Sequence, residues 1–320
     1  MGDKLTLKIL TTNRHEVYLK TMAKLGHHFT LLTQLENKDL SWHDHYGAPP
    51  ENMQVCSWGP AVKARLKSGY FDYLVLHTVE DLVFFRRFIN EKTIFIIHLA
   101  LYKHRAHFLA RSILKLGIVR YLRHVKKMQV VAVSPWKRQS WGLHTARCIP
   151  LSPLEVGRCY SRNIQPRIMT AGNHFSSRPE MNAKLLKHVQ EALPVSVFGQ
   201  NPDISSSCHP ASRSDFLEQM RNHDIFLFTT ERPWNDGYNT AVLEAMSAGL
   251  AVVSMQNPSS PIEHGRSGYL ARSYPELINY LHQLSEQPQL TKNFGQRNRE
   301  IIAEKFSFQS FLEAWCKVLL

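Results

Sequence analysis

Two carboxylates of one short segment could serve a shared ligand. Asp236 and Glu244 are eight positions apart, and the residues between them predict a helix over 239–248. Asp236 would lie at the entrance of this helix and Glu244 about two turns inside it, so both side chains can face one cleft. Gly237, just before the helix, lets the backbone approach a ligand closely.

The start of the same helix is also a predicted anion site. The first backbone N–H groups of a helix have no partner within it, and the helix dipole favours negative charge there. The amides concerned belong to Tyr238, Asn239 and Thr240. A diphosphate on these amides, with a carboxylate nearby that accepts hydrogen bonds from sugar hydroxyls, describes a site for a nucleotide-sugar.

The segment around the two carboxylates resembles the donor-binding domain of the retaining glycosyltransferases with the GT-B fold, glycosyltransferase family 4 or "group 1". The signature of that family is Glu-x7-Glu, set in Glu-Gly-Phe-Gly…Glu-Ala-Met-Ala-x-Gly-x-Pro-Val-Val. About ten positions agree in order and spacing, with Asp236 in place of the first Glu. The matching residues are Asp236-Gly237-Tyr238-Asn239 and Glu244-Ala245-Met246-Ser247-Ala248-Gly249-Leu250-Ala251-Val252-Val253.

Further segments extend this resemblance over most of the chain. The loop that begins at Gly172 is similar to the Gly-Arg-x4-Lys loop that holds the donor diphosphate, with Asn173 at the usual Arg and Arg178 at the usual Lys. The turn at Gly199 and Gln200 is similar to a turn of that family that lies near the base of the donor nucleotide. The segments Ile262-Glu-His-Gly265, Gly26–Leu32, Asp72–His77, Ile96–His98 and Phe306–Phe308 also resemble the family pattern.

The resemblance implies a role for each of four residues. Arg178, with the amides near Gly237, would neutralise the leaving diphosphate without a metal. Glu244 would hold ribose hydroxyls, Asp236 would position the donor sugar, and His98 would lie near the anomeric carbon. The implied donor-binding set is Gly172, Asn173, Arg178, Gly199, Gln200, Asp236, Gly237, Tyr238, Asn239, Thr240 and Glu244. The implied substrates are a nucleotide-diphosphate sugar and a glycan or lipid-linked acceptor, with no further cofactor.

The elements that must position these residues follow from hydrophobic periodicity. Short apolar strands alternate with longer helical stretches, which predicts an α/β fold with parallel sheets. Periodicity lapses between Ile149 and Pro166, which predicts a linker between two Rossmann-like doubly wound domains, residues 1–155 and 156–306. The resemblance adds a terminal helix, 307–320, that packs back on the first domain. Ligands of such folds bind at the carboxyl ends of the strands, which favours a cleft between the domains.

Charge is concentrated in one part of the chain. The net charge is +13, and residues 92–154 contribute 12 basic residues and no carboxylate. Within the segment 103–127, apolar residues at 109, 113 and 116 and at 118, 122 and 125 have helical spacing, which predicts two basic amphipathic stretches broken near Gly117. Such stretches suit either a helix with a solvated face or contact with an anionic membrane or a pyrophosphate-linked lipid. No motif for nucleic acid accompanies the charge.

The composition of the chain excludes several classes of protein. The chain has 43% hydrophobic and 20% charged residues, which excludes a disordered or collagen-like protein. Its five scattered cysteines include no Cys-x-x-Cys pair, which favours the reducing cytosol and no zinc site. No apolar run approaches the roughly 20 residues that span a bilayer, so attachment to the inner face of the plasma membrane would be peripheral.

Each candidate residue also has an ordinary structural explanation. Glu244 could be a solvated helix carboxylate, Asp236 an N-cap, Arg178 a surface residue and His98 a core histidine. Two other functions stay open: a nucleotide-sugar 2-epimerase on the same fold, and a catalytically degenerate subunit of a transferase complex. Neither of these would add a sugar to an acceptor.

Overall fold

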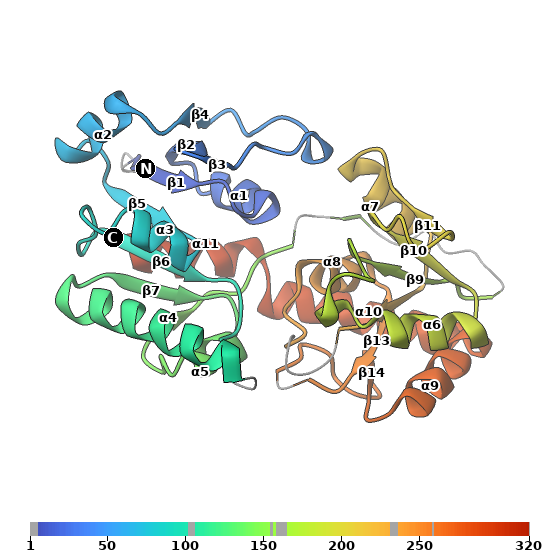
Figure 1. Cartoon of the computed structure of the whole chain (residues 1–320). Coiled ribbons are helices and arrows are strands. Elements are labelled where there is room, and N and C mark those ends of the chain that lie inside the picture. Colours follow the sequence, from blue (N-terminus) through green and yellow to red (C-terminus); the bar gives the residue numbers. More distant parts are fainter. Residues whose placement is uncertain are drawn as a thin grey trace. The chain divides into compact units, whose positions relative to one another are not determined.

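The chain forms two compact units, shown in Figure 1. The computed structural model describes residues 6–101, 106–153, 156–157, 165–230, 236–257 and 259–319. Unit 1 comprises Met1–Leu151 with Leu312–Leu320, and unit 2 comprises Ser152–Phe311. Lys103, Arg105 and much of the predicted linker lie outside the described residues. Within the described part of the chain, no helix combines the length and apolarity needed to cross a membrane.

Unit 1 is built on an eight-stranded sheet in the order β3-β2-β1-β5-β6-β7-β8, with β4 paired to β2. All its strand pairs are parallel except β2 with β3. The strands are β1 (Lys8–Thr12), β2 (His28–Leu35), β3 (Lys38–Asp39), β4 (Met53–Ser57), β5 (Tyr73–Leu76), β6 (Thr93–Ile97), β7 (Gln129–Ala132) and β8 (Arg147–Cys148). The order of the parallel strands reverses between β1 and β5, so a crevice is expected at their carboxyl ends.

Helices cover the sheet of unit 1 because its strands bury side chains on both faces. Leu10, Leu76 and Phe95 belong to a core cluster with residues of α3 and α4, while the alternate residues Ile9 and Ile94 are also fully buried. The helices are α1 (Glu16–Ala23), η1 (Asp44–Tyr46), α2 (Pro60–Lys67), α3 (Val79–Phe84), α4 (Ala106–Val125), α5 (Pro135–Ser140) and most of α11 (Phe308–Leu319).

Unit 2 has a six-stranded, wholly parallel sheet in the order β11-β10-β9-β12-β13-β14. Successive strands are added toward one edge of the sheet up to β11 and toward the other edge from β12 on, which is the strand order of a Rossmann-like sheet. The strands are β9 (Ile168–Ala171), β10 (Val195–Phe198), β11 (Ser207–Cys208), β12 (Ile225–Phe228), β13 (Ala251–Met255) and β14 (Gly268–Ala271). The helices are η2 (Pro179–Met181), α6 (Ala183–Ala192), α7 (Arg213–Arg221), α8 (Thr240–Ala248), α9 (Tyr274–Glu286) and α10 (Pro288–Lys305).

A close backbone approach fixes α10 against the turn that follows α8. A Cβ atom added to Gly295 would lie 1.8 Å from the carbonyl oxygen of Gly249, so only glycine fits there. One turn later, the buried Asn298 Nδ2 donates to the carbonyls of Leu250 and Ser267, each at 2.7 Å. These contacts position α8, the helix that carries Glu244.

The structure corrects the prediction for the basic segment. Helix α4 runs through Gly117 without a break, and it buries Ser112, Val119 and Leu122. The predicted apolar rows are only partly its packed face: Leu116, Ile118 and Leu122 pack on the core, whereas Leu109, Ile113 and Val125 are exposed. One interior glycine costs only about 1 kcal/mol, which the packing of α4 on the sheet outweighs.

The same substitution at two helical glycines should therefore have opposite effects. In Gly295→Ala, the added methyl group meets the Gly249 backbone, and we expect a loss of about 1–3 kcal/mol in the free energy of unfolding. In Gly117→Ala, where nothing lies within 4 Å of the added atom, we expect a gain of roughly 0.5–1 kcal/mol. Urea unfolding followed by circular dichroism measures both, and equal effects would contradict the close packing of α10.

Candidate functional site

Two loops of unit 2 meet at the carboxyl ends of β9 and β10. A Cβ atom on Gly199, whose φ is +132°, would lie 2.1 Å from the carbonyl oxygen of Gly172. The Gln200 amide donates to Asn173 Oδ1 at 2.8 Å. Four of the predicted donor-binding residues, 172, 173, 199 and 200, are therefore neighbours at one edge of the sheet.

Asn201 holds these loops together and was not predicted from the sequence. Its Nδ2 donates to the carbonyl of Gly172 at 2.8 Å and to Ser207 Oγ at 3.1 Å, while its Oδ1 accepts from the Phe175 amide at 3.0 Å. The side chain is buried. A polar residue directly after a glycine turn was the available signal, but many surface turns share it.

Arg178 lies at the end of the first loop, where it precedes η2. Its Nε donates to Glu180 Oε1 at 2.9 Å, and its side chain is 47% exposed. An exposed pair of this kind is worth about 0–1 kcal/mol, so an anion could replace the carboxylate at little cost. Arg178 is accessible, and among the described residues it has no hydrogen bond to another predicted site residue.

The start of α8 differs from its predicted form. Asn239 is the N-cap, and its Oδ1 accepts from the Ala241 amide at 2.9 Å. The N-cap explanation for Asp236 is therefore wrong. Asp236 is fully buried, and its Oδ1 accepts from the Tyr238 amide at 3.2 Å, so this amide is not one of the unpaired donors that the sequence predicted. A carboxylate two residues ahead reaches that amide in an Asx-type turn.

Glu244 is buried in an ion pair rather than solvated. Its side chain is 1% exposed, and its Oε1 accepts from Nη2 of Arg213, at the start of α7. Burial raises the pKa of the Glu244 carboxyl, and the Arg213 guanidinium opposes this shift. Sequence reasoning missed Arg213, because its distance of 31 positions from Glu244 gives no local signal.

Gly237 lies beside a buried oxygen acceptor. Its φ is +74°, and an added Cβ atom would lie 3.1 Å from both Asn257 Oδ1 and Ser260 Oγ. Asn257 Oδ1 has no hydrogen-bond partner among the described residues. A buried acceptor without a partner is costly, so its place next to the candidate loop indicates a position where a ligand hydroxyl or amide could donate.

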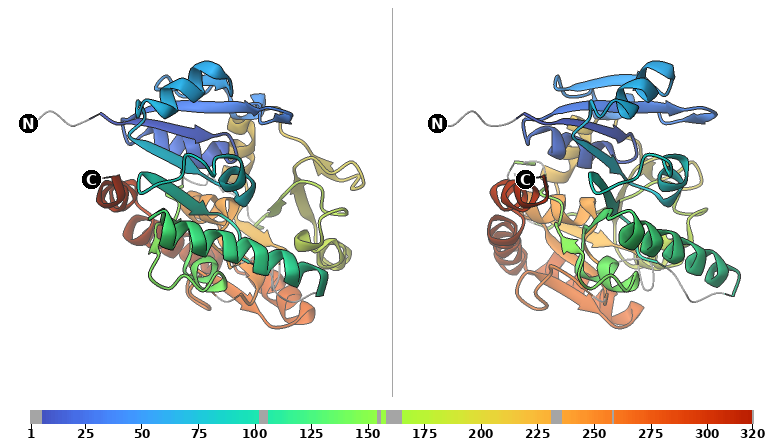
Figure 2. Two further views of the ribbon diagram at one scale, coloured as in Figure 1. Left: turned by 60° about the vertical axis from the view of Figure 1, so that its left-hand side comes forward. Right: turned by 90° about the vertical axis from the view of Figure 1, so that its left-hand side faces the viewer.

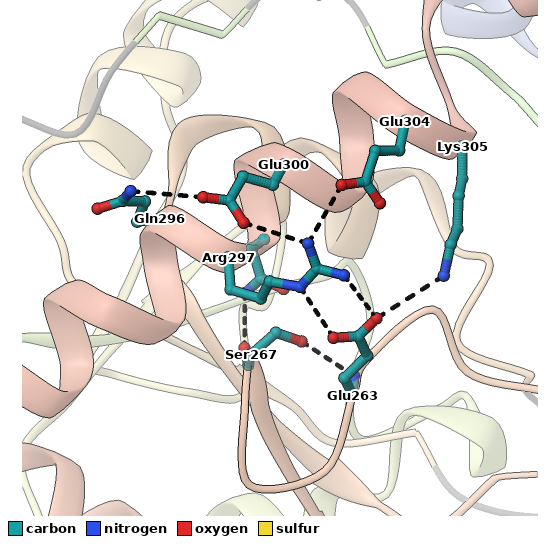
Figure 3. A network of polar contacts seen from close by, with 8 residues as sticks. Glu263, Ser267, Gln296, Arg297, Glu300, Glu304 and Lys305 are labelled. Atoms are coloured by element: carbon teal, nitrogen blue, oxygen red, sulfur yellow. Dashed lines mark hydrogen bonds and ion pairs between the residues drawn. The ribbon is translucent and has the colours of Figure 1, made fainter.

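The loop after β13 is fixed to α10 by a charged network, drawn in Figure 3. Arg297 donates from Nε and Nη2 to the two carboxylate oxygens of Glu263, each at 2.9 Å. Glu300 and Glu304 accept from the same guanidinium, and Lys305 lies 3.8 Å from Glu263. A bidentate pair of this geometry orders both partners, which holds the loop near Ser260 in place.

In unit 1, His98 takes part in a chain of hydrogen bonds. His98 follows β6, His77 follows β5, and their Nε2 and Nδ1 atoms are 2.9 Å apart. His77 Nε2 lies 2.9 Å from Thr11 Oγ1. Both histidines come from the carboxyl ends of strands next to the reversal in strand order. His77, which the sequence analysis left out of the site, is thus the direct neighbour of His98.

Two further rings lie against the His77–His98 pair. The His15 ring centroid lies 4.1 Å from that of His98, and the Tyr18 ring meets His98 edge-on at 4.9 Å. Burial lowers the pKa of His77 to about 3 and that of His98 well below its usual value, and the neighbouring His15 adds to both shifts. Both rings are therefore neutral at pH 7, where each can donate one hydrogen bond and accept another.

Within the described residues, no group of three or more His, Cys, Asp or Glu side chains is placed to bind a metal ion. Each unit thus carries its own set of candidate residues: polar loops after β9, β10, β12 and β13 in unit 2, and the buried His77 with the partly buried His98 after β5 and β6 in unit 1.

The buried histidines should make the stability of unit 1 depend on pH. Because the folded pKa of His77 is about 3 and its unfolded value about 6.5, the unfolded state binds more protons between these values, and stability falls as pH falls through this window. The slope for one such group is at most about 1.4 kcal/mol per pH unit. His77→Gln should lessen this slope between pH 6 and pH 4.

Urea unfolding followed by tryptophan fluorescence measures this effect, because five of the six tryptophans lie in unit 1: Trp42, Trp58, Trp136, Trp141 and Trp315. Above pH 7 the free energy of unfolding should depend on pH in the same way in the wild type and the variant, which serves as the internal control. Identical slopes below pH 6 would show that His77 is not held neutral by burial.

A family model described as "Glycosyl transferases group 1" matches residues 178–287, which include Arg178, Arg213, Asp236 and Glu244. The poly(ribitol-phosphate) alpha-N-acetylglucosaminyltransferase of Staphylococcus aureus is 33% identical over 85 residues. That stretch is 25% of this chain and 17% of the relative, so the chain matches only a small part of that protein.

Solved structures show the same fold. Anabaena HepE in complex with UDP-glucose has a TM-score of 0.72 at 14% identity, over 98% of this chain and 99% of the other. A variant of S. aureus TarM, in complex with fondaparinux, alpha-GlcNAc-glycerol and UDP, has a TM-score of 0.62 at 15% identity, over 77% of this chain and 55% of the other. The expected α/β class with parallel sheets is thereby confirmed. Residues 178–287 are similar to the group 1 glycosyltransferases, and they lie in a chain that has the fold of the GT-B glycosyltransferases.

Proposed function

We propose that the protein is a glycosyltransferase that uses a nucleotide-diphosphate sugar, with UDP as the expected leaving group. The observation that carries this proposal is the buried Glu244 on α8, which lies within the stretch that matches the group 1 glycosyltransferases. UDP is named because the HepE and TarM structures hold UDP or UDP-glucose.

In the proposed site, unit 2 binds the donor at the ends of its parallel strands. Glu244 would accept hydrogen bonds from ribose hydroxyls, while the Arg213 guanidinium pairs with it in its buried position. Arg178 would exchange Glu180 for the diphosphate and stabilise the charge that develops as the bond to the sugar breaks. Asp236, which precedes Gly237, and Asn257 Oδ1, which lies beside Gly237, would accept from sugar hydroxyls.

In the proposed reaction, unit 1 supplies the acceptor side. His98 would contact the donor sugar near its anomeric carbon, as a neutral ring held by His77. The acceptor would be a glycan or a lipid-linked sugar, and the new bond would keep the anomeric configuration of the donor. Proton NMR of the product reads that configuration directly. The same proposal places the protein in glycosyltransferase family 4 and has it act without a metal ion.

Two alternatives keep the donor site but lose the transfer. A 2-epimerase would convert the nucleotide-sugar without an acceptor, and a degenerate subunit would bind it without turnover. Release of free UDP from UDP-glucose, with an acceptor extract present but not without it, supports the transferase. The same assay with GDP-, ADP- and CMP-sugars tests the choice of base.

Replacing Glu244 by Gln should weaken donor binding. A hydrogen bond to a charged group is worth about 1.5–3 kcal/mol, so the dissociation constant for UDP should rise roughly tenfold to a hundredfold. Gln keeps the shape and still accepts from Arg213, which limits the damage that an alanine would cause through an unpaired buried guanidinium. Isothermal titration calorimetry measures the change, and Glu286→Gln, on the exposed end of α9, is the control.

A loss of thermal stability with unchanged UDP affinity would instead make the Glu244–Arg213 pair purely structural. The two outcomes differ in the readout, because the first moves the dissociation constant and the second moves only the melting temperature.

Gly237→Ala and Gly265→Ala separate backbone strain from crowding of the site. Both glycines have a left-handed φ, +74° and +73°. An alanine at 237 would also press on Asn257 and Ser260, whereas an alanine at 265 meets nothing within 4 Å. Both variants should lose a similar 1–2 kcal/mol from strain, but only Gly237→Ala should lose UDP affinity, by about tenfold or more. Equal UDP affinity in the two variants would count against a donor at Gly237.

A further inference from the structure

The outer face of α4 is apolar although it lies on the surface of unit 1. Helix α4 packs on the sheet through Ser112, Val119 and Leu122, and it lies on one side of that sheet in both views of Figure 2. Its opposite side carries five large apolar side chains with exposed fractions of 42–65%: Leu109, Ile113, Leu114, Tyr121 and Val125. Most of the large hydrophobic side chains that the described structure exposes are on this helix. We call these five residues the α4 face.

An apolar groove continues the α4 face toward α3. A cavity of about 480 Å³ lies there, lined by Val83, Phe84, Leu114 and Ile118 among others. Val83 is itself 44% exposed on α3. Arg86 and Arg111 also line the groove. The surface thus combines an apolar groove with guanidinium groups beside it.

Cations outnumber carboxylates around the α4 face, where Glu80 and Asp81 line the groove and are paired with Lys115 and Arg14. Residues 92–154 contain no Asp or Glu, and Arg111, Arg120, Lys126 and Lys127 are exposed on or just after α4. In the described part of the chain, the one ion pair formed by α4 joins Lys115 to Glu80 of α3, at 3.4 Å. A contiguous apolar patch rimmed by charge of one sign marks an interaction surface.

We propose that the α4 face docks on an anionic phospholipid bilayer, with α4 lying in the plane of the interface. Its 20 residues have a length of about 30 Å, and a helix with one apolar side and flanking Lys and Arg residues suits the headgroup boundary. Ile113, Leu114 and Tyr121 enter the acyl region, and Arg111 and Arg120 contact phosphates. The α3–α4 groove accommodates part of an acyl chain.

Charge decides between a bilayer and the other occupants of this face. A symmetric pair of copies would bring the same cations together in one interface, where like charges are unfavourable. Nucleic acid would pair with the cations, but it would leave Ile113, Leu114 and Val125 without a partner, since bases stack on aromatic rings and not on branched aliphatic side chains. An anionic bilayer satisfies both the charge and the apolar side chains.

Sedimentation of the full chain with sonicated vesicles tests this proposal. We expect binding to phosphatidylcholine vesicles that contain 30% phosphatidylglycerol at low salt, and at least tenfold weaker binding to pure phosphatidylcholine or in high salt. Arg111→Gln with Arg120→Gln should weaken binding roughly tenfold to thirtyfold. Ile113→Ser with Leu114→Ser should weaken it about thirtyfold or more, while the melting temperature stays within a few degrees because both side chains are more than 60% exposed.

Two controls match these variants. Lys184→Gln with Lys187→Gln removes two exposed cations from α6 of unit 2, and Val55→Ser removes an exposed apolar residue from β4. Neither should change vesicle binding. The proposal is overturned if the chain does not bind anionic vesicles at low salt, or if the controls weaken binding as much as the α4 variants do.

A third result would also overturn it: a dimer in solution that Ile113→Ser with Leu114→Ser converts to a monomer, with no vesicle binding. None of these measurements uses a nucleotide or a sugar, so the outcome is independent of the proposed transferase activity.

Discussion

The reversal of strand order in a parallel sheet is the constraint on which the candidate site depends. In unit 2 the connections leave β9 and β12 in opposite directions, and in unit 1 they do so at β1 and β5. Loops that diverge leave a crevice at the carboxyl edge that no crossover helix covers. Gly172, Thr229, His77 and Asn13 each follow one of these four strands. The fold thus selects which segments can hold a ligand before any side chain is considered.

Burial then imposes a second requirement on the polar side chains at these edges. A buried carboxylate needs a cation, and Glu244 has Arg213. A buried histidine needs partners for both ring nitrogens, and His77 has Thr11 and His98. These partners fix the orientation of the side chains before a ligand arrives, which is the condition for electrostatic preorganisation. Arg213 and His77 therefore matter to the site as supports for Glu244 and His98.

Periodicity predicted the elements that carry continuous apolar runs and missed those that do not. The central strands β6, β12 and β13 are wholly buried, and their apolar runs were evident from the sequence. Strand β4 has no such run, because only Met53 of its five residues is buried, so periodicity gives no signal for it. The motif located Asp236 and Glu244, but Arg213 and Asn201 act through contacts of tertiary structure, which local spacing cannot encode.

Composition located the cationic segment, but only the structure separates its surface charge from its internal charge. Arg138 and Arg147 donate to the carbonyls of Ala146 and Lys317, and Lys137 is buried in α5. Lys137 is therefore part of the interior, whereas Arg138 is partly buried and Arg147 is exposed although each is bound to a backbone carbonyl of unit 1. Most of the other exposed cations that the structure describes in this segment lie on or just after α4, because a helix on the outside of a parallel sheet has one side that no other element of its unit covers. An excess of charge that looks uniform along 63 residues thus becomes one directed surface.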